Sequence, residues 1–320
     1  MVESRHRGAC AVADAAGNIV LALGDVGRPV YGRSAIKPLQ ALPLVESGAA
    51  DTFALGAREI ALACASHRGE AMHVTTVAAW LERLGLGVRD LECGAHAPGD
   101  AATAEALIRA GMPPTAVHNN CSGKHAGFLT TARHFGEPTR GYIAATHPVQ
   151  QRVEAVLSAM TGLDLATAPR GIDGCGIPVV GIPLSGMATA MARLADPAGL
   201  PETRAAAAER ILDAMAAEPL LVAGTDTITS AVLATAGPRV AVKNGAEGMF
   251  CAALRQQGLG IAIKIADGAA RAADVVLGAI LVKVGAIDRS ETAALAAFFS
   301  PEVRNIAGTV VGRLRPTESL

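Results

Sequence analysis

The amino-acid sequence predicts an α+β fold in which helices flank an antiparallel sheet. Three patterns predict it: two alternating strands joined by a short turn near the N-terminus, three consecutive strands near the C-terminus, and helical periodicity over most of the chain between them. We expect the strands near the two ends of the chain to pair in one sheet, and the helices of the middle region to pack against that sheet.

The N-terminal elements are a hairpin followed by a helix. The hairpin is ACAVADAAGNIVLALGD (residues 9–25), with Ala-Gly-Asn as its turn, and it is broken by Pro29 and Gly32. A helix is expected from Ser34 to Gly48, because a glycine typically stops a helix and Pro38 falls where proline is best tolerated, near the first turn.

Helices dominate the middle of the chain, over about 57–216, and strands return after it. The expected helices lie near 71–84, 101–110, 122–136, 148–160 and 203–216. Three strands follow at 239–245, 248–257 and 258–265, and a helix over 266–287 closes the pattern. No repeat, linker or boundary divides the chain, so residues 1–320 are expected to form one domain with its sheet region in about 1–33 and 238–290 and its helical region in between.

Composition and charge exclude several classes of partner. Apolar residues make up 51% of the 320 residues and aromatics only 3%, so the core is built from aliphatic side chains. The net charge of −1 includes no polybasic block, which argues against nucleic acid and membrane surfaces as partners. The N-terminus lacks the apolar run of a signal peptide, and the six scattered cysteines suggest reduced thiols, so a soluble cytoplasmic enzyme is expected.

Lysine is scarce, which draws attention to each one. Of the 28 basic residues only five are lysines, at positions 37, 124, 243, 264 and 283. Arginine does not lose its proton in proteins, whereas a lysine with a lowered pKa serves as a base or a metal ligand. Lys264 and Lys283 fit ordinary strand and helix patterns; the other three stand in motifs.

Ser34 and Lys37 form an S-x-x-K motif at an expected helix start. Positions i and i+3 share a helix face, so the Lys37 amine can reach the Ser34 hydroxyl and take its proton. Taken alone the motif is weak, because a serine at this position is also an ordinary helix cap.

Two later residues strengthen that interpretation. Lys243-Asn244-Gly245 ends a predicted strand and matches the K-x-G element of serine β-lactamases and penicillin-binding proteins, which pair an early S-x-x-K with a second serine and a late lysine. Ser66, in CASHRGE, is the most natural second serine. A loop hydroxyl and an edge-strand lysine are the ordinary alternatives for these two residues.

Cysteines and a lysine form a second group. Cys121 and Lys124 stand three apart in HNNCSGKHAGF, and Cys175 lies in a Gly-rich turn beside Asp173. Thiolates suit Zn²⁺, although lysine is a rare ligand because its amine must be neutral. Buried structural cysteines are the more ordinary interpretation at this point, and a metal site is the alternative.

Together, the motifs resemble the rhizobial-type (class 3, Ser-Lys) L-asparaginases. The matching blocks extend from residue 2 to about 270: VESRHRG at 2–8, RSAIKPLQALPLVESG at 33–48, CASHRGE at 64–70, CGAHAP at 93–98, HNNCSGKHAGFL at 118–129, THPVQ at 146–150, DGCGIP at 173–178 and KNGAEG at 243–248. The resemblance implies a single asparaginase domain, a fold similar to serine β-lactamases and glutaminases, a homodimer, and L-asparagine as the small-molecule substrate.

The resemblance also implies roles for seven residues. Two Ser–Lys pairs share one pocket, Ser34 with Lys37 and Ser66 with Lys243, and zinc is held beside it by Cys121, Lys124 and Cys175. We expect Ser34 to attack the amide, Lys37 to act as base, and Ser66 with Lys243 to move the proton toward the departing ammonia. Candidate substrate-binding residues are Arg33 for the carboxylate, Asp173 for the α-ammonium, and His125; a structural role is the alternative for Arg33 and Asp173.

Two other functions are compatible with parts of the pattern. A glutaminase or a penicillin-recognising acyl-transfer enzyme would use the same serines and lysines, but it would need no thiol site. A zinc-binding protein without enzymatic activity would need no serine. A metal-centred hydrolase is disfavoured, because the chain has no H-E-x-x-H or comparable histidine-rich motif.

Overall fold

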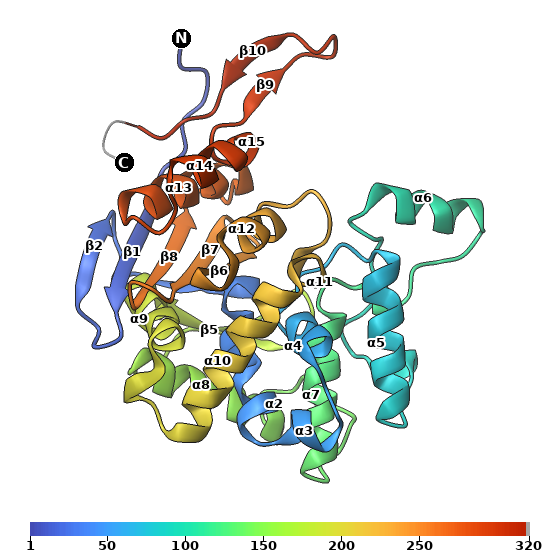
Figure 1. The fold of residues 1–320 in the computed structure, drawn as a ribbon. Helices are drawn as coiled ribbons and strands as arrows, with labels where there is room; N and C mark the ends of the chain where they lie inside the picture. The colour runs from blue at the N-terminus through green and yellow to red at the C-terminus, as the bar shows by residue number, and fades with distance from the viewer. Residues whose placement is uncertain (318–320) are drawn as a thin grey trace.

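The central sheet joins the two ends of the chain. The structure is a computed structural model that describes residues 1–317. Its main sheet is antiparallel with the order β2-β1-β8-β7-β6, so the N-terminal hairpin pairs with the last of the three C-terminal strands (Figure 1). The strands are β1 (Gly8–Asp14), β2 (Ile19–Leu23), β6 (Val240–Gly245), β7 (Met249–Leu254) and β8 (Leu259–Ile265).

Two smaller sheets accompany it. The first has the order β3-β5-β4, formed by β3 (Pro29–Tyr31), β4 (Arg170–Ile172) and β5 (Pro178–Pro183). The second is a hairpin of β9 (Glu302–Arg304) and β10 (Val310–Arg313), whose residues are all exposed. This hairpin projects away from the main body (Figure 1, red).

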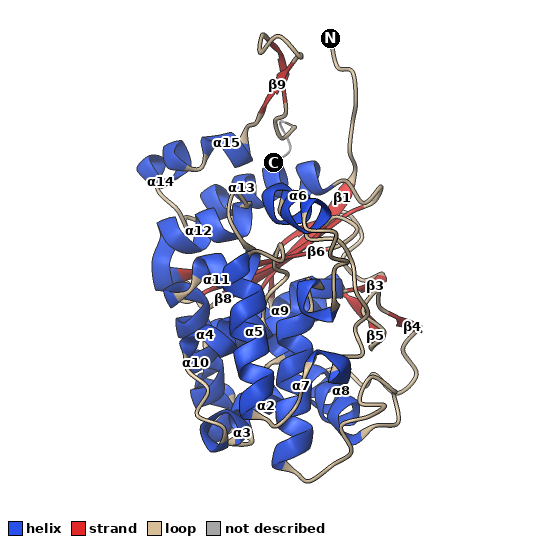
Figure 2. Cartoon of the chain, turned by 90° about the vertical axis from the view of Figure 1, so that its right-hand side faces the viewer, coloured by secondary structure: helices blue, strands red, loops and turns tan. Residues whose placement is uncertain are grey.

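Helices lie on both sides of the main sheet. Helix α9 packs against β1, β7 and β8, while α13 packs against β7 and β8, and Figure 2 places them on opposite sides of the sheet. The α-helices are α1 (Lys37–Gln40), α2 (Leu42–Glu46), α3 (Ala49–Thr52), α4 (Ala57–Ala63), α5 (Ala71–Arg83), α6 (Ala101–Arg109), α7 (Ser122–His134), α8 (Pro148–Thr161), α9 (Leu184–Ala195), α10 (Glu202–Ala217), α11 (Pro219–Ala223), α12 (Ile228–Ala236), α13 (Ala270–Lys283), α14 (Arg289–Ala294) and α15 (Ala296–Phe299).

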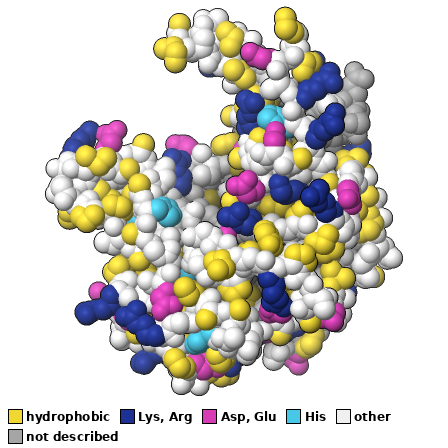
Figure 3. All heavy atoms as spheres, turned by 180° about the vertical axis from the view of Figure 1, so that it is seen from behind, with side chains coloured by type: hydrophobic (Ala, Val, Ile, Leu, Met, Phe, Trp, Pro, Cys, Tyr) yellow, Lys and Arg dark blue, Asp and Glu magenta, His cyan; other side chains and the backbone are white. Residues whose placement is uncertain are grey.

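Short 3-10 turns connect several of these elements. They are η1 (Arg33–Ile36), η2 (Val88–Asp90), η3 (Ala116–His118), η4 (Pro197–Gly199) and η5 (Gly237–Arg239). Among the described helices, none is long and apolar enough to cross a membrane. On the face shown in Figure 3, cationic and anionic side chains are interspersed rather than gathered by sign, in keeping with the net charge of −1.

The α+β prediction is confirmed, although some elements were not expected, among them β3, α12, β9 and β10. The segment 34–48 is not one helix: it is divided into η1, α1 and α2, and a proline occupies the first turn of each of the two α-helices. Pro38 and Pro43 have no N–H to continue a preceding helix, so each begins a new one. The strands β4 and β5 lie inside the stretch for which only helices were expected; they are short, and only β5 is largely buried.

Candidate active site

Ser34 lies in η1, directly after a residue with an unusual backbone conformation. Arg33 has φ of 49°, in the left-handed region that non-glycine residues rarely adopt. Such strain persists only where the surrounding structure enforces it, and it is common at functional sites. Ser34 is partly exposed, and its hydroxyl makes no hydrogen bond within residues 1–317. The serine is therefore presented at a bend with its hydroxyl unengaged.

Lys37 is fully buried three residues later. Its amine Nζ contacts the carbonyl oxygen of Ala65, the Ser66 hydroxyl at 3.1 Å and the carbonyl oxygen of Asn120 at 3.5 Å. Burial lowers the pKa of Lys37, because water no longer stabilises the charged form. Two carbonyl oxygens can accept both N–H bonds of a neutral amine, which leaves its lone pair for a hydroxyl proton.

Ser66 lies between two lysine amines. It follows α4, and its backbone N–H donates to the carbonyl oxygen of Val222 at 2.9 Å. Its hydroxyl oxygen is 3.1 Å from Lys37 Nζ and 2.9 Å from Lys243 Nζ. The hydroxyl therefore bridges the two amines and can pass a proton from one to the other.

Lys243 reaches this point from the edge strand β6. It is fully buried, and burial lowers its pKa well below the ordinary value, with a further decrease from the charge of Lys37. Two ammonium groups bonded to the same hydroxyl repel each other in a buried site. The sharing of Ser66 therefore favours a state in which only one of the two amines carries a proton.

A glycine allows β6 to approach the turn that carries Ser34. A Cβ atom at Gly245 would lie 2.9 Å from the backbone nitrogen of Ala35 and 3.2 Å from the carbonyl oxygen of Gly32. Both contacts are with backbone, which cannot move aside as a side chain can. The end of the lysine-bearing strand and the serine-bearing turn thus touch directly.

Cys121, Lys124 and Cys175 converge next to Lys37. Lys124 Nζ is 3.1 Å from Cys175 Sγ, and the thiol of Cys121 hydrogen-bonds with Cys175 and with Lys37. All of these side chains are buried. Helix α7, which carries Lys124, packs closely on α4. A Cβ atom at Gly123 would lie only 2.2 Å from the carbonyl oxygen of Leu62, so only glycine allows the two helices to come this near.

The two thiols have opposite pKa shifts. The hydrogen bond from Cys175 lowers the pKa of Cys121 well below the usual range, aided by the charges of Lys37 and Lys124, while the same hydrogen bond and burial raise the pKa of Cys175. Burial alone would lower the pKa of Lys124, but the adjacent Cys121 and Cys175 raise it. Without a metal, this cluster favours one thiolate beside an ammonium.

Arg33 and Asp173 form an ion pair at the edge of this cluster. Arg33 Nε donates to Asp173 Oδ1 at 2.7 Å, and Asp173 Oδ2 is 3.9 Å from Cys175 Sγ. Burial favours a higher pKa for Asp173, but Lys124 and Arg33 outweigh it and keep the pKa below its usual value. A guanidinium beside a carboxylate offers the complement of an amino-acid zwitterion.

His125 is buried behind the cluster. Its Nδ1 is 2.7 Å from the Tyr142 hydroxyl, which accepts the backbone N–H of Glu92 at 2.8 Å. Burial lowers the pKa of His125 well below its usual value, and Lys124 and Lys37 lower it further. Its Nε2 is buried and has no partner among the described residues, so the ring retains one polar atom for a ligand.

The structure thus places all ten predicted residues in one connected region, although Ser34 bonds to neither amine. Three contributors were missed: the carbonyl oxygens of Ala65 and Asn120, and the side chain of Asn244. Asn244 directly follows Lys243, so adjacency to the motif was the available signal for its side chain. Backbone acceptors leave no such signal in a sequence.

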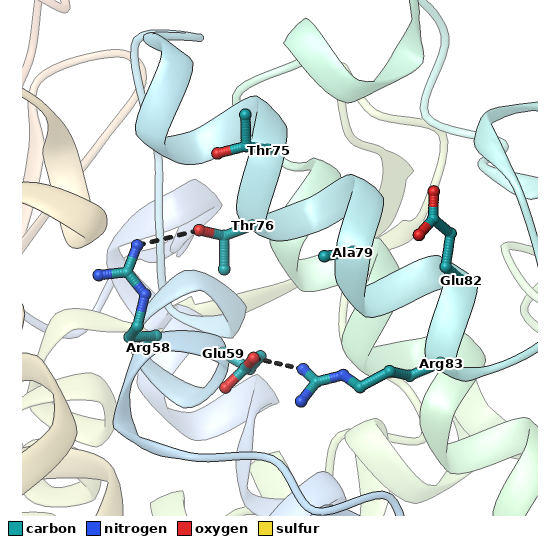
Figure 4. A pocket seen from close by; sticks show the side chains of 7 residues that line it. All are labelled: Arg58, Glu59, Thr75, Thr76, Ala79, Glu82 and Arg83. Carbon is teal, nitrogen blue, oxygen red and sulfur yellow. Dashed lines mark hydrogen bonds and ion pairs between the residues drawn. The ribbon is translucent and has the colours of Figure 1, made fainter.

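A separate hollow of about 690 Å³ lies on the surface between α4 and α5, away from this region. Its cations are already engaged: Arg58 donates to Thr76 Oγ1 at 3.1 Å, and Arg83 pairs with Glu59 (Figure 4). None of its lining residues belongs to the serine–lysine or thiol groups, so the hollow is not part of the candidate active site.

Comparison with known families gives one match. A sequence model of the family L-asparaginase II matches residues 1–316, nearly the whole chain. A search of the curated proteins finds no match. The matched span includes every residue of the candidate active site.

Proposed function

Because the chain belongs to the L-asparaginase II family and is therefore an L-asparaginase, we propose that it releases ammonia from L-asparagine through an acyl-enzyme formed on Ser34. One observation carries the mechanism: the Ser66 hydroxyl lies 3.1 Å and 2.9 Å from the amines of Lys37 and Lys243, both buried. A hydroxyl held between two amines of lowered pKa is suited to proton transfer, whereas the unengaged, partly exposed Ser34 is suited to attack.

The proposed acylation begins with the Ser34 hydroxyl. Its oxygen bonds to the side-chain amide carbon while its proton passes to the neutral amine of Lys37, one turn along the chain. The proton then moves through Ser66 and Lys243 toward the amide nitrogen, which leaves as ammonia when the C–N bond breaks. Backbone N–H groups near Ser34 and on edge strand β6 hold the developing oxyanion.

Deacylation reverses these roles. Water gives a proton to a lysine amine, attacks the aspartyl ester, and releases aspartate as the Ser34 oxygen recovers its proton. Because Lys37 Nζ bonds to Ser66 rather than Ser34 before substrate binds, the Lys37–Ser34 contact forms only in the substrate complex in this mechanism. Catalytic hydrogen bonds commonly tighten at that stage.

Substrate selection is assigned to the ion pair and the buried histidine. Arg33 binds the α-carboxylate and Asp173 the α-ammonium, while His125 Nε2 offers a buried polar atom that has no partner among the described residues. Recognition of both α-substituents fixes how far the amide carbon lies from Ser34. Glutamine has one more methylene, which places its amide carbon beyond the attacking oxygen.

Ammonia release should therefore be fast with L-asparagine and about 100-fold slower or more with L-glutamine, in kcat/KM. The two amides and a chromogenic β-lactam are assayed side by side with the same enzyme preparation. Faster turnover of glutamine would assign the glutaminase function, and hydrolysis of the β-lactam without amide turnover would assign the penicillin-recognising one.

Zinc is proposed beside this pocket, held by Cys121, Lys124 and Cys175. The fit rests on the convergence of two thiols and an amine, with Lys124 Nζ 3.1 Å from Cys175 Sγ. Residues 1–317 contain no group of three His, Cys, Asp or Glu side chains placed to hold a metal, so the lysine is the necessary third donor. Bound zinc would supply a positive charge that orients the substrate at its open position.

Removing the metal should raise KM for L-asparagine about tenfold or more and change kcat by less than about threefold, because the Ser–Lys groups supply nucleophile and base. Metal content is measured in the wild type and in Cys175→Ser, and kinetics are measured before and after chelation and zinc repletion. Loss of turnover with unchanged substrate affinity and an intact fold would contradict an orienting role.

A further inference from the structure

We propose that Asn244 is a positioning residue that fixes the amine of Lys243 on Ser66; this deepens the proposed function and rests on it. Lys243 Nζ donates to two oxygens of Asn244, the backbone carbonyl at 2.7 Å and the side-chain Oδ1 at 2.8 Å. The Ser66 hydroxyl, at 2.9 Å, is its third partner. Asn244 thus supplies two of the three hydrogen bonds that hold this amine.

The orientation of the Asn244 amide is set by a second donor. The buried Thr229 hydroxyl donates to the same Oδ1 atom at 3.3 Å. With donors on both sides of Oδ1, the oxygen is fixed toward Lys243 and the NH₂ group points the other way. Among residues 1–317 this NH₂ group donates no hydrogen bond, so Oδ1 carries the side chain's contacts.

Such fixing is needed because Lys243 has a long side chain and a neighbour of like charge. Four titratable groups act on its amine: Lys37 across Ser66, Cys121 before α7, Cys64 after α4 and Cys251 on β7. Burial raises the pKa of Cys64 and of Cys251 to about 12, so both are neutral thiols at neutral pH. Repulsion from a charged Lys37 would move the amine off Ser66 unless other acceptors held it.

Two near-isosteric variants separate this role from a general structural one. Asn244→Leu keeps most of the volume and removes Oδ1, so kcat should fall about 10- to 100-fold while KM changes less than about threefold. Asn244→Asp keeps an oxygen at the same place and gives it a charge. The carboxylate should raise the pKa of Lys243, which moves the pH profile of kcat toward alkaline pH.

The Leu variant should move the same profile the opposite way, because the charged amine loses an acceptor and its pKa falls. Opposite shifts support the inference; a role limited to packing would produce neither. Unchanged kcat in Asn244→Leu, or a rise in KM in both variants with unmoved pH profiles, would overturn it. If Asn244→Leu does not fold, as judged by circular dichroism, the direction of the shift in Asn244→Asp decides.

Lys243→Met separates this inference from the mechanism on which it rests. If Lys243→Met retains wild-type kcat, the relay through Ser66 is wrong, whatever Asn244 does. If Lys243→Met is inactive while Asn244→Leu keeps the wild-type kcat and pH profile, the relay stands and only the role of Asn244 is wrong.

Discussion

Replacing Ser34 with alanine is expected to lower kcat for ammonia release from L-asparagine by about 10³-fold or more, with a small change in KM. The substitution removes only the attacking oxygen, so no acyl-enzyme can form, while the groups that bind substrate remain. The Ser34 hydroxyl makes no hydrogen bond within the described residues, so its removal should leave the fold and thermal unfolding unchanged. Initial rates by a coupled ammonia assay give the comparison.

Two further serine variants make this result interpretable. Ser290→Ala, at an exposed position of α14, should keep wild-type activity. Ser66→Ala should be impaired but not inactive, because it interrupts proton transfer and leaves the nucleophile. Activity that survives in Ser34→Ala and disappears in Ser66→Ala would move the nucleophile to Ser66; survival in both would point to the metal site.

Replacing Lys37 with methionine is expected to lower kcat by about 10²- to 10⁴-fold, the range for loss of a general base. Methionine has a similar length and suits the buried position, but it cannot accept a proton. In the wild type, burial lowers the pKa of this amine, and the amine must be neutral to act. The wild-type kcat should therefore fall as pH decreases through that lowered pKa, as the amine becomes protonated.

The matched control is Lys283→Met, at an exposed position of α13. It should leave kcat and its pH dependence unchanged. Near-wild-type turnover in Lys37→Met, with circular dichroism showing a folded protein, would remove Lys37 from the mechanism and leave Lys243 as the base.

Much of the fold could be predicted because periodicity and turn chemistry agree along the chain. The hairpin at 9–25, the three C-terminal strands and the closing helix correspond to β1, β2, β6, β7, β8 and α13. The strand β4 could not be recognised, since a three-residue strand has no measurable period, and β5 is a short run of buried residues without the alternation that marks a strand. Proline placement, visible in the sequence, divided the segment 34–48 into separate helices.

The candidate site was predictable as a set of residues but not as a set of contacts. The scarcity of lysine singled out Lys37, Lys124 and Lys243, and the structure brings all three into one buried region. The sequence did not show which serine each lysine contacts. The amine of Lys37 contacts Ser66 instead of Ser34, because the carbonyl oxygens of Ala65 and Asn120 that accept its hydrogen bonds lie beside Ser66. The spacing of three residues shows that the side chains of Ser34 and Lys37 can reach each other. It does not reveal hydrogen-bond acceptors from distant segments that compete for the Lys37 amine.

The acyl-enzyme is the central claim, and partitioning with hydroxylamine tests it most directly. Hydroxylamine competes with water for an aspartyl ester, so the ratio of aspartyl hydroxamate to aspartate is measured with L-asparagine and with the β-methyl ester of L-aspartate as substrates. A common acyl-enzyme predicts one ratio for both substrates at each hydroxylamine concentration, since the leaving group has already departed. Different ratios, or no hydroxamate from either substrate, would contradict a serine ester and favour direct attack by water.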